Sequence, residues 1–290
     1  MTEPLPAPTD PERESIMIAA FEGWNDAGNA ASHAIDHLAR VWNAQEYGAL
    51  DPEEYHDFQV NRPTISRLPS GERVIAWPGT VISTCAAVSN ADRRISLARG
   101  IEPSTRWRQF CNELLDFAED LEVTTLITCG ALLVDVPHTR PLPTFVTSEE
   151  PEARRRYGLE PSDYEGPTGI VGVLGHEAAL RGITVLSMWV GVPHYVAHPP
   201  SPKATVALMG QLERLIGFPV DLGNLPDDAA AWQRGADELA EDDDEIAQHV
   251  QQLEALLDET SLPEASGDAI AAEFERFLRR RDDGPGTASG

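Results

Sequence analysis

The pattern of apolar and polar positions is most informative over residues 15–42. An apolar run over residues 16–21 has the length of a buried strand, and a glycine-containing turn follows it. Apolar side chains then recur at helical spacing, at Ile35, Leu38 and Trp42. A strand, a turn and a helix in this order are typical of the start of an open α/β sheet. In such sheets ligands bind at the carboxyl ends of the strands.

The same patterns predict that strands and helices alternate as far as residue 216. The strands are predicted at residues 55–60, 80–88, 95–99, 124–134, 145–146 and 183–190, with a hairpin over 65–77 that turns at Ser70-Gly71. Helices are predicted from Pro103 to Leu121 and over residues 149–157, 170–181 and 203–216. The run at 124–134 is apolar throughout, which indicates a central strand of a sheet that is parallel at its centre.

Strand patterns end near Pro226, and three apolar stripes at helical spacing follow. The stripes are Trp232, Ala236 and Leu239; Ile246, Val250, Leu253 and Leu257; and Ile270, Phe274, Phe277 and Leu278. The second and third helices are expected to pack antiparallel. We therefore divide the chain into a disordered tail (1–14), an α/β domain (15–222), a helical segment (223–281) and a second disordered tail (282–290).

The charge balance of the chain excludes two classes of partner. The 290 residues hold 48 acidic and 22 basic side chains besides histidine, for a net charge of −26. Nucleic acids and anionic membranes both require basic surface, so neither is the expected partner. The start of the chain lacks the basic and apolar regions of a signal peptide, which predicts a cytoplasmic protein. The three cysteines lie in apolar sequence, so we expect buried, reduced thiols.

Candidate chemistry gathers in four polar loops, over residues 22–28, 135–141, 164–169 and 193–203. Because the carboxyl ends of parallel strands share one edge of a sheet, some of these loops are expected to meet there. The candidate ligand-binding residues are Glu22, Asn25, Asp26, His138, Arg140, Glu165, Thr168, His194 and Lys203. The central geometric expectation is that segments far apart in the chain bring their charged and amide-bearing ends together above a shared β-layer, and the sequence leaves open whether they form one pocket.

Each candidate also has a purely structural interpretation. Asp26 suits capping of the next helix as well as it suits a binding site. His138 with Arg140 could hold an anion, yet a single histidine between prolines more often packs or caps. A lysine at a helix start, as at Lys203, is mildly unfavourable. It is therefore expected to pair with Glu22, Asp26 or Glu165, or to face a ligand.

The sequence lacks the motifs of phosphate binding, zinc binding and nucleophilic catalysis. The first loop has no phosphate-binding glycine spacing, and its two acids would repel a phosphate. His194 and His198 are four residues apart, but the prolines around them forbid the helix that would stack them on zinc. No serine lies in a nucleophile elbow and no cysteine has a histidine near it in sequence. The sequence therefore predicts no metal site, no cofactor and no catalytic residue.

The sequence segments that contain the four polar loops, together with the ending FERFLR, resemble the actinobacterial branch of the proteasome assembly chaperone 2 (PAC2) family. These segments are FEGWNDAG, GALLVDVPHTRP, YEGPTGIVGVL and VPHYVAHPPSPKA. The resemblance implies a three-layer α/β/α sandwich of the phosphorylase/hydrolase-like type with a helical C-terminal segment. It also implies a homo-oligomer, plausibly a trimer.

Family relatives assist proteasome assembly and dock through a C-terminal tail of hydrophobic residue, tyrosine and any residue. This sequence ends in Ala288-Ser289-Gly290, so docking by that route is not expected.

Three functional hypotheses follow. The first is a non-catalytic, oligomeric assembly or interaction protein. The second is a small-ligand-binding protein or an enzyme, similar to nucleoside phosphorylases or carboxylate–amine ligases, that uses a cleft at the strand ends. In the third, the acidic helical segment is a docking arm for a basic partner. The missing nucleophile favours the first.

Overall fold

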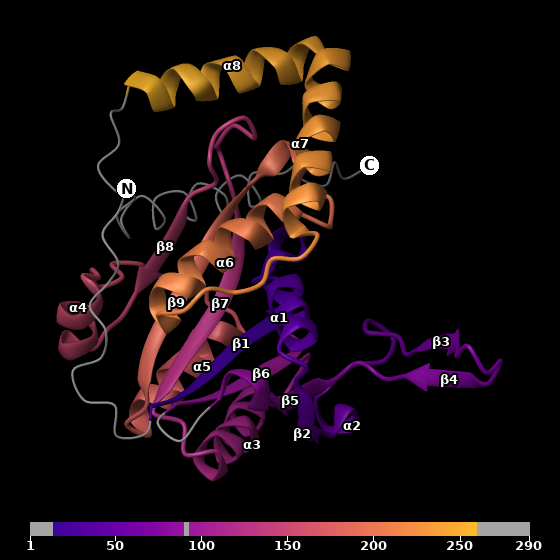
Figure 1. Cartoon of the computed structure of the whole chain (residues 1–290), viewed down its shortest axis with the longest axis vertical. Coiled ribbons are helices and arrows are strands. Elements are labelled where there is room, and N and C mark those ends of the chain that lie inside the picture. Colours follow the sequence, from indigo (N-terminus) through magenta and orange to yellow (C-terminus); the bar gives the residue numbers. More distant parts are fainter. Residues whose placement is uncertain (1–13, 90–92, 260–290) are drawn as a thin grey trace, which may run out of the picture.

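The computed structural model describes residues 14–89 and 93–259, and its centre is a seven-stranded sheet (Figure 1). The strands lie in the order β2-β5-β6-β1-β7-β9-β8. Strands β6, β1, β7 and β9 run parallel, whereas β2, β5 and β8 pair antiparallel at the edges. The parallel centre is as predicted. The strand bounds are β1 Glu14–Glu22, β2 Gln45–Leu50, β5 Thr80–Thr84, β6 Arg93–Ile101, β7 Thr125–Val134, β8 Thr144–Thr147 and β9 Thr184–Pro193.

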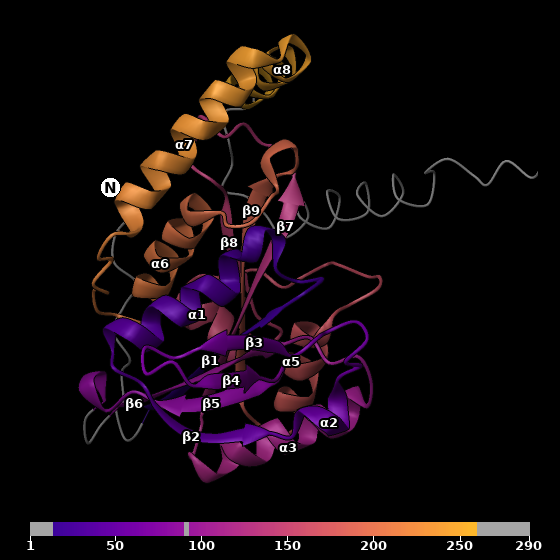
Figure 2. The same cartoon turned by 90° about the vertical axis from the view of Figure 1, so that its right-hand side faces the viewer.

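Helices cover both faces of the sheet, so the predicted α/β/α sandwich is confirmed (Figure 2). Strand β1 shows the layering, since its side chains alternate between the faces. Ile16 and Ile18 pack with α1 and α6, and Met17 and Phe21 pack with α3 and α5. The helices are α1 Ala30–Val41, α2 Pro52–Tyr55, α3 Trp107–Asp120, α4 Pro151–Tyr157, α5 Ile170–Leu180 and α6 Pro202–Ile216. Short 3-10 turns form η1 Ala27–Asn29, η2 Ala86–Val88 and η3 His194–Val196.

The predicted hairpin forms a two-stranded sheet of its own that projects from the body (Figure 1). Strands β3 (Thr64–Arg67) and β4 (Arg73–Ala76) pair antiparallel. Gly71 in the turn has φ = 88°, a conformation that side chains other than glycine's rarely allow. We call β3, β4 and the flanking residues 60–78 the arm.

One sequence prediction near residue 50 is wrong, and one strand there was not predicted. Residues 55–60 are not a strand: α2 ends at Tyr55, whose buried ring packs edge-on against Phe110 at a centroid distance of 5.3 Å. Strand β2 was missed because it lies at the sheet edge, where most of its side chains are exposed and carry no apolar alternation. Helix α3 begins at Trp107 rather than at Pro103, since Arg106 before it is left-handed with φ = 55°.

In the part of the chain that the structure describes, two further helices follow the α/β domain, α7 (Leu225–Asp242) and α8 (Asp244–Glu259). They match the first two predicted stripes. The third stripe, at residues 270–278, and the two predicted tails lie outside the described residues, except for Glu14, which belongs to β1. Helix α7 runs along α6, and α8 turns across the end of the sheet (Figure 1). The boundary at residue 222 lies just before α7 and stays a prediction. Within residues 14–89 and 93–259, no helix combines the length and apolar character that crossing a bilayer needs.

Candidate functional site

The polar loops meet at the carboxyl edge of the parallel strands, as the sequence predicted. The amide of Ser201 donates to the carbonyl of Gly28 at 2.8 Å, which joins the first and last loops. The amide of Ala131 donates to the carbonyl of Asn25, also at 2.8 Å, and ties the first loop to β7. Asn25 in turn packs against Gly169 at the start of α5. What the side chains do at this edge differs from one loop to the next.

Asp26 caps helix α1. Its carboxylate is buried and accepts hydrogen bonds from the amides of Ala31 (2.7 Å) and Ser32 (3.2 Å), which would otherwise lack partners at the helix start. Burial raises the pKa of this carboxyl above its ordinary value, although the hydrogen bonds act in the opposite direction. Glu22, at the end of β1, forms an ion pair with Arg99 at 2.5 Å. Both acids therefore have structural partners.

Asn25 and Glu102 link three elements. The side-chain amide of Asn25 donates to Glu102 Oε1 at 2.8 Å, and the same oxygen accepts the amide of Ile170 at 2.9 Å. The chain's own carboxylate thus occupies the start of α5, where the free amides of a helix attract an anion. Thr168 and Glu165 are themselves exposed.

His138 is the centre of a second network, and its side chain is only 1% exposed. The Tyr195 hydroxyl accepts from the His138 backbone amide at 2.6 Å and lies 2.7 Å from Nδ1. Burial raises the pKa of Tyr195 to about 12, so the hydroxyl keeps its proton. Because a carboxylate only accepts, Nε2 of His138 is the donor to Asp237 on α7, 3.0 Å away.

Lys203 belongs to the His138 network, which corrects its predicted pairing with Glu22, Asp26 or Glu165. Its ammonium donates to the carbonyl oxygen of His138 and to the side-chain oxygen of Gln233 on α7. Burial lowers the pKa of Lys203, while Asp237 nearby acts to raise it.

Arg140 and His194 lie against α8. Arg140 forms an ion pair with Glu254 at 3.3 Å. His194 Nδ1 pairs with Asp135 at 2.9 Å, and its ring meets that of His249 edge-on. Both candidates thus contact the helical segment.

The contacts of seven of the nine candidates divide between two regions of one edge, and the other two, Glu165 and Thr168, are exposed. Glu22, Asn25 and Asp26 bind elements of the α/β domain; His138, Arg140, His194 and Lys203 lie toward α7 and α8. Their role in ligand binding stays a prediction. The sequence interpretation missed the partners Glu102, Tyr195, Gln233, Asp237, His249 and Glu254, four of which belong to the helical segment.

A pocket of about 580 Å³ lies elsewhere, between α1 and α7, and none of the nine candidates lines it. Its volume is in the range of small-molecule sites. The lining residues are His33, Asp36, His37, Arg40, Pro200, Pro202, Thr205, Leu225, Asp228, Ala231 and Trp232.

The cysteines are free and buried, as predicted. Burial raises the thiol pKa of Cys85 and of Cys111 to about 12, and that of Cys129 is raised as well. All three are therefore protonated at neutral pH, a state in which a thiol is a poor nucleophile.

The architecture defines a class of protein: a layered α/β domain with a helical extension that binds the edge where the parallel strands end. The model of the PAC2 family matches residues 20–240, so the chain belongs to the PAC2 family. A search of curated proteins finds no match.

Solved structures agree with this assignment. A PAC2 family protein of Streptomyces avermitilis is 51% identical, with a TM-score of 0.76 over 82% of this chain and 100% of that one. A proteasome-assembly chaperone homologue of Mycobacterium tuberculosis is 45% identical, with a TM-score of 0.72 over 81% of this chain and 99% of that one. An archaeal proteasome activator of Pyrococcus furiosus shares the fold, with a TM-score of 0.64 at 15% identity over 82% of this chain and 97% of that one.

Proposed function

We propose that this chain is a non-catalytic, self-associating member of the PAC2 family that acts in the assembly of other proteins. The relative named as a proteasome-assembly chaperone homologue supports an assembly role. The structural partners of the polar edge and the protonated thiols support a role without catalysis. Free, buried cysteines suit the reducing cytoplasm, where we place the protein. Three copies is the oligomer that we propose from the family resemblance.

The observation that carries the proposal is the arm. A two-stranded hairpin is at best marginally stable alone in water, and this one lies apart from the main sheet. It nevertheless exposes large apolar side chains: Ile65 is 58% exposed, Ile75 53% and Trp77 52%. Exposed apolar clusters of this kind mark interaction surfaces.

The strand register places these residues on one face of the arm. Ile65 lies opposite Ile75, and Arg67 lies opposite Arg73. Because side chains alternate along a strand, both pairs share a face. Like charges directly across a ribbon are destabilising. An acidic surface laid on this face would remove that repulsion as well as cover the isoleucines.

A second copy of this chain supplies such a surface. Residues 60–78 hold three arginines and a single acid, Glu72, whereas the chain as a whole carries a net charge of −26. A basic, apolar arm on a strongly acidic body is complementary to the body of another copy. We therefore assign the arm to contact between subunits.

Light scattering on arm variants tests this proposal. The chain is expected to be an oligomer, and the Ile65→Ser/Ile75→Ser variant is expected to dissociate. Loss of two buried isoleucines weakens association by about 3 kcal/mol, or roughly two orders of magnitude in Kd. Arg67→Glu/Arg73→Glu is expected to dissociate as well, as is the wild type in about 1 M salt to a smaller extent, since salt screens the charges.

Leu180→Ser is the matched control, because Leu180 is 70% exposed at the end of α5, outside the arm. It is expected to keep the wild-type mass. Circular dichroism verifies that each variant is folded. A monomeric wild type, or arm variants with the mass of the wild type, would refute the proposal.

A further inference from the structure

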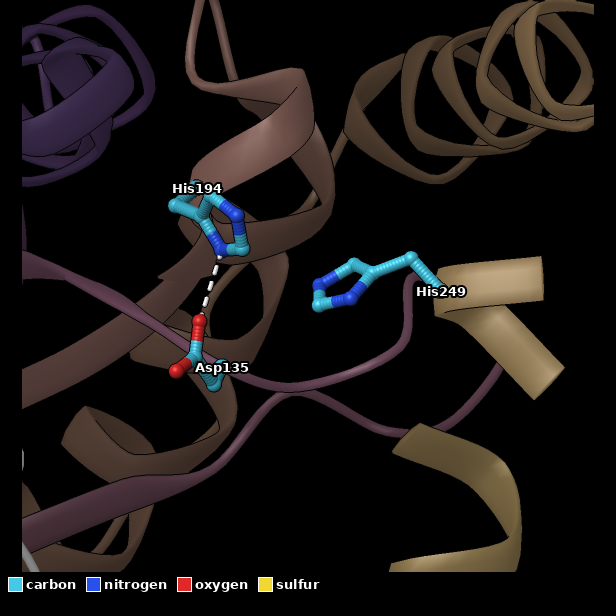
Figure 3. Close-up of side chains that lie close together, drawn as sticks. All are labelled: Asp135, His194 and His249. Carbon is cyan, nitrogen blue, oxygen red and sulfur yellow. Dashed lines mark ion pairs between the residues drawn. The ribbon is translucent and has the colours of Figure 1, made fainter. Parts of the chain in front are cut away.

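We propose that Asp135, His194 and His249 form a binding site for a divalent transition metal, Zn²⁺ in the first place, that joins α8 to the sheet. The three residues come from separate parts of the chain: the loop after β7, the turn η3 after β9, and α8 (Figure 3). This inference does not depend on the proposed function. It departs from the sequence prediction, which expected no metal site.

The donor atoms are of the right kind and lie close together. One nitrogen of each imidazole and one carboxylate oxygen lie within 4.8 Å of one another. His194 Nδ1 and Asp135 Oδ1 are 2.9 Å apart. Donors on a tetrahedral zinc ion, with bonds of 2.0–2.2 Å, lie about 3.3 Å apart. Small side-chain adjustments would therefore bring all three onto one ion.

His249 supplies the second, independent observation. Its Nε2 atom is buried and has no hydrogen-bond partner among the described residues. A buried polar nitrogen without a partner is unfavourable, and a ligand that accepts its lone pair, or an accompanying water, removes this penalty. The ring of His249 is turned toward His194 and Asp135, with ring centroids of the two imidazoles 5.2 Å apart (Figure 3).

The ligand set determines the class of metal. Two imidazoles with one carboxylate suit Zn²⁺ and neighbouring transition metals, whereas Mg²⁺ and Ca²⁺ prefer oxygen donors alone. With three protein ligands, a water would complete a tetrahedron. The ion would then fix α8 to the carboxyl edge of the sheet, adding to the contact of Arg140 with Glu254.

Calorimetric titration of the full chain, made without a polyhistidine tag and freed of metal by a chelator, tests the site. One Zn²⁺ is expected to bind per chain and to raise the melting temperature. Co²⁺ is expected to bind there too and to give the visible absorption bands of a four-coordinate ion. His249→Ala and Asp135→Asn should each weaken Zn²⁺ binding by more than 10–100-fold. That range is typical of losing a residue that only hydrogen-bonds to a metal ligand.

His198→Ala is the matched control, since His198 is an exposed histidine near His194 in sequence that is not part of the cluster. It is expected to bind Zn²⁺ like the wild type, and circular dichroism verifies that all variants are folded. Failure of the wild type to bind one Zn²⁺ would overturn the inference. So would weak binding of several ions that is insensitive to His249→Ala, which would show adventitious binding to the acidic surface only.

Discussion

Replacing His138 with alanine is expected to lower the free energy of unfolding by about 3 kcal/mol and to loosen α7 from the sheet edge. The substitution removes a fully buried ring, together with its contacts to Tyr195 and Asp237. Lys203 and Gln233 then remain as the link between the loop and α7. Denaturant unfolding measures the loss of stability, and limited proteolysis measures the exposure of residues 225–259.

His198→Ala serves as the control for this prediction as well. The His198 side chain is exposed, and it forms a hydrogen bond with the carbonyl of the next residue, so a change within about 0.5 kcal/mol is expected. If His138→Ala were as stable and as resistant to protease as His198→Ala, the network would not be what holds α7.

Gly169→Ala is expected to destabilise the fold by at least about 2 kcal/mol through overpacking. A Cβ atom at this position would lie 2.2 Å from Asn25 Nδ2 and 2.3 Å from Oδ1. Asn25 cannot move aside without breaking its bond to Glu102, the carboxylate that also accepts the amide of Ile170 at the start of α5. Thermal or denaturant unfolding measures the effect.

Two comparisons isolate the cause of that effect. Gly210→Ala places a Cβ in open space on an exposed part of α6 and is expected to stabilise the chain by about 0.5–1 kcal/mol. In an Asn25→Ala background the clash is absent, so Gly169→Ala should have little further effect. An undiminished loss in that background would mean that the close packing of Gly169 on Asn25 is not responsible.

Much of the fold could be predicted from the sequence because its core elements carry strong local patterns. The apolar run that became β7 and the stripe from Trp107 to Leu121 that became α3 need no tertiary information to recognise. The edge strand β2 could not be found in this way. Its side chains are mostly exposed, and its pairing with β5 is a property of the assembled sheet.

The candidate site was predictable only in part. Topology brings the loops to one edge, and a parallel sheet requires this of any sequence that forms it. Which side chains pair is decided by α7 and α8, whose helical periodicity says nothing of where they dock. Asp237, the partner of His138, and Glu254, the partner of Arg140, are distant from them in sequence. Of the two interpretations of Asp26, the structure supports helix capping, because its carboxylate accepts hydrogen bonds from two amides of α1.

The central claim is that the arm is buried between copies of the chain, and hydrogen exchange of the backbone amides of β3 and β4 tests it most directly. The exchange is measured on concentrated protein and on protein diluted until light scattering reports a monomer. We predict slow exchange of these amides in the concentrated sample and fast exchange after dilution, while β1 and β7 remain protected in both. Equally fast exchange of β3 and β4 in an oligomeric sample and in the monomer would contradict the account.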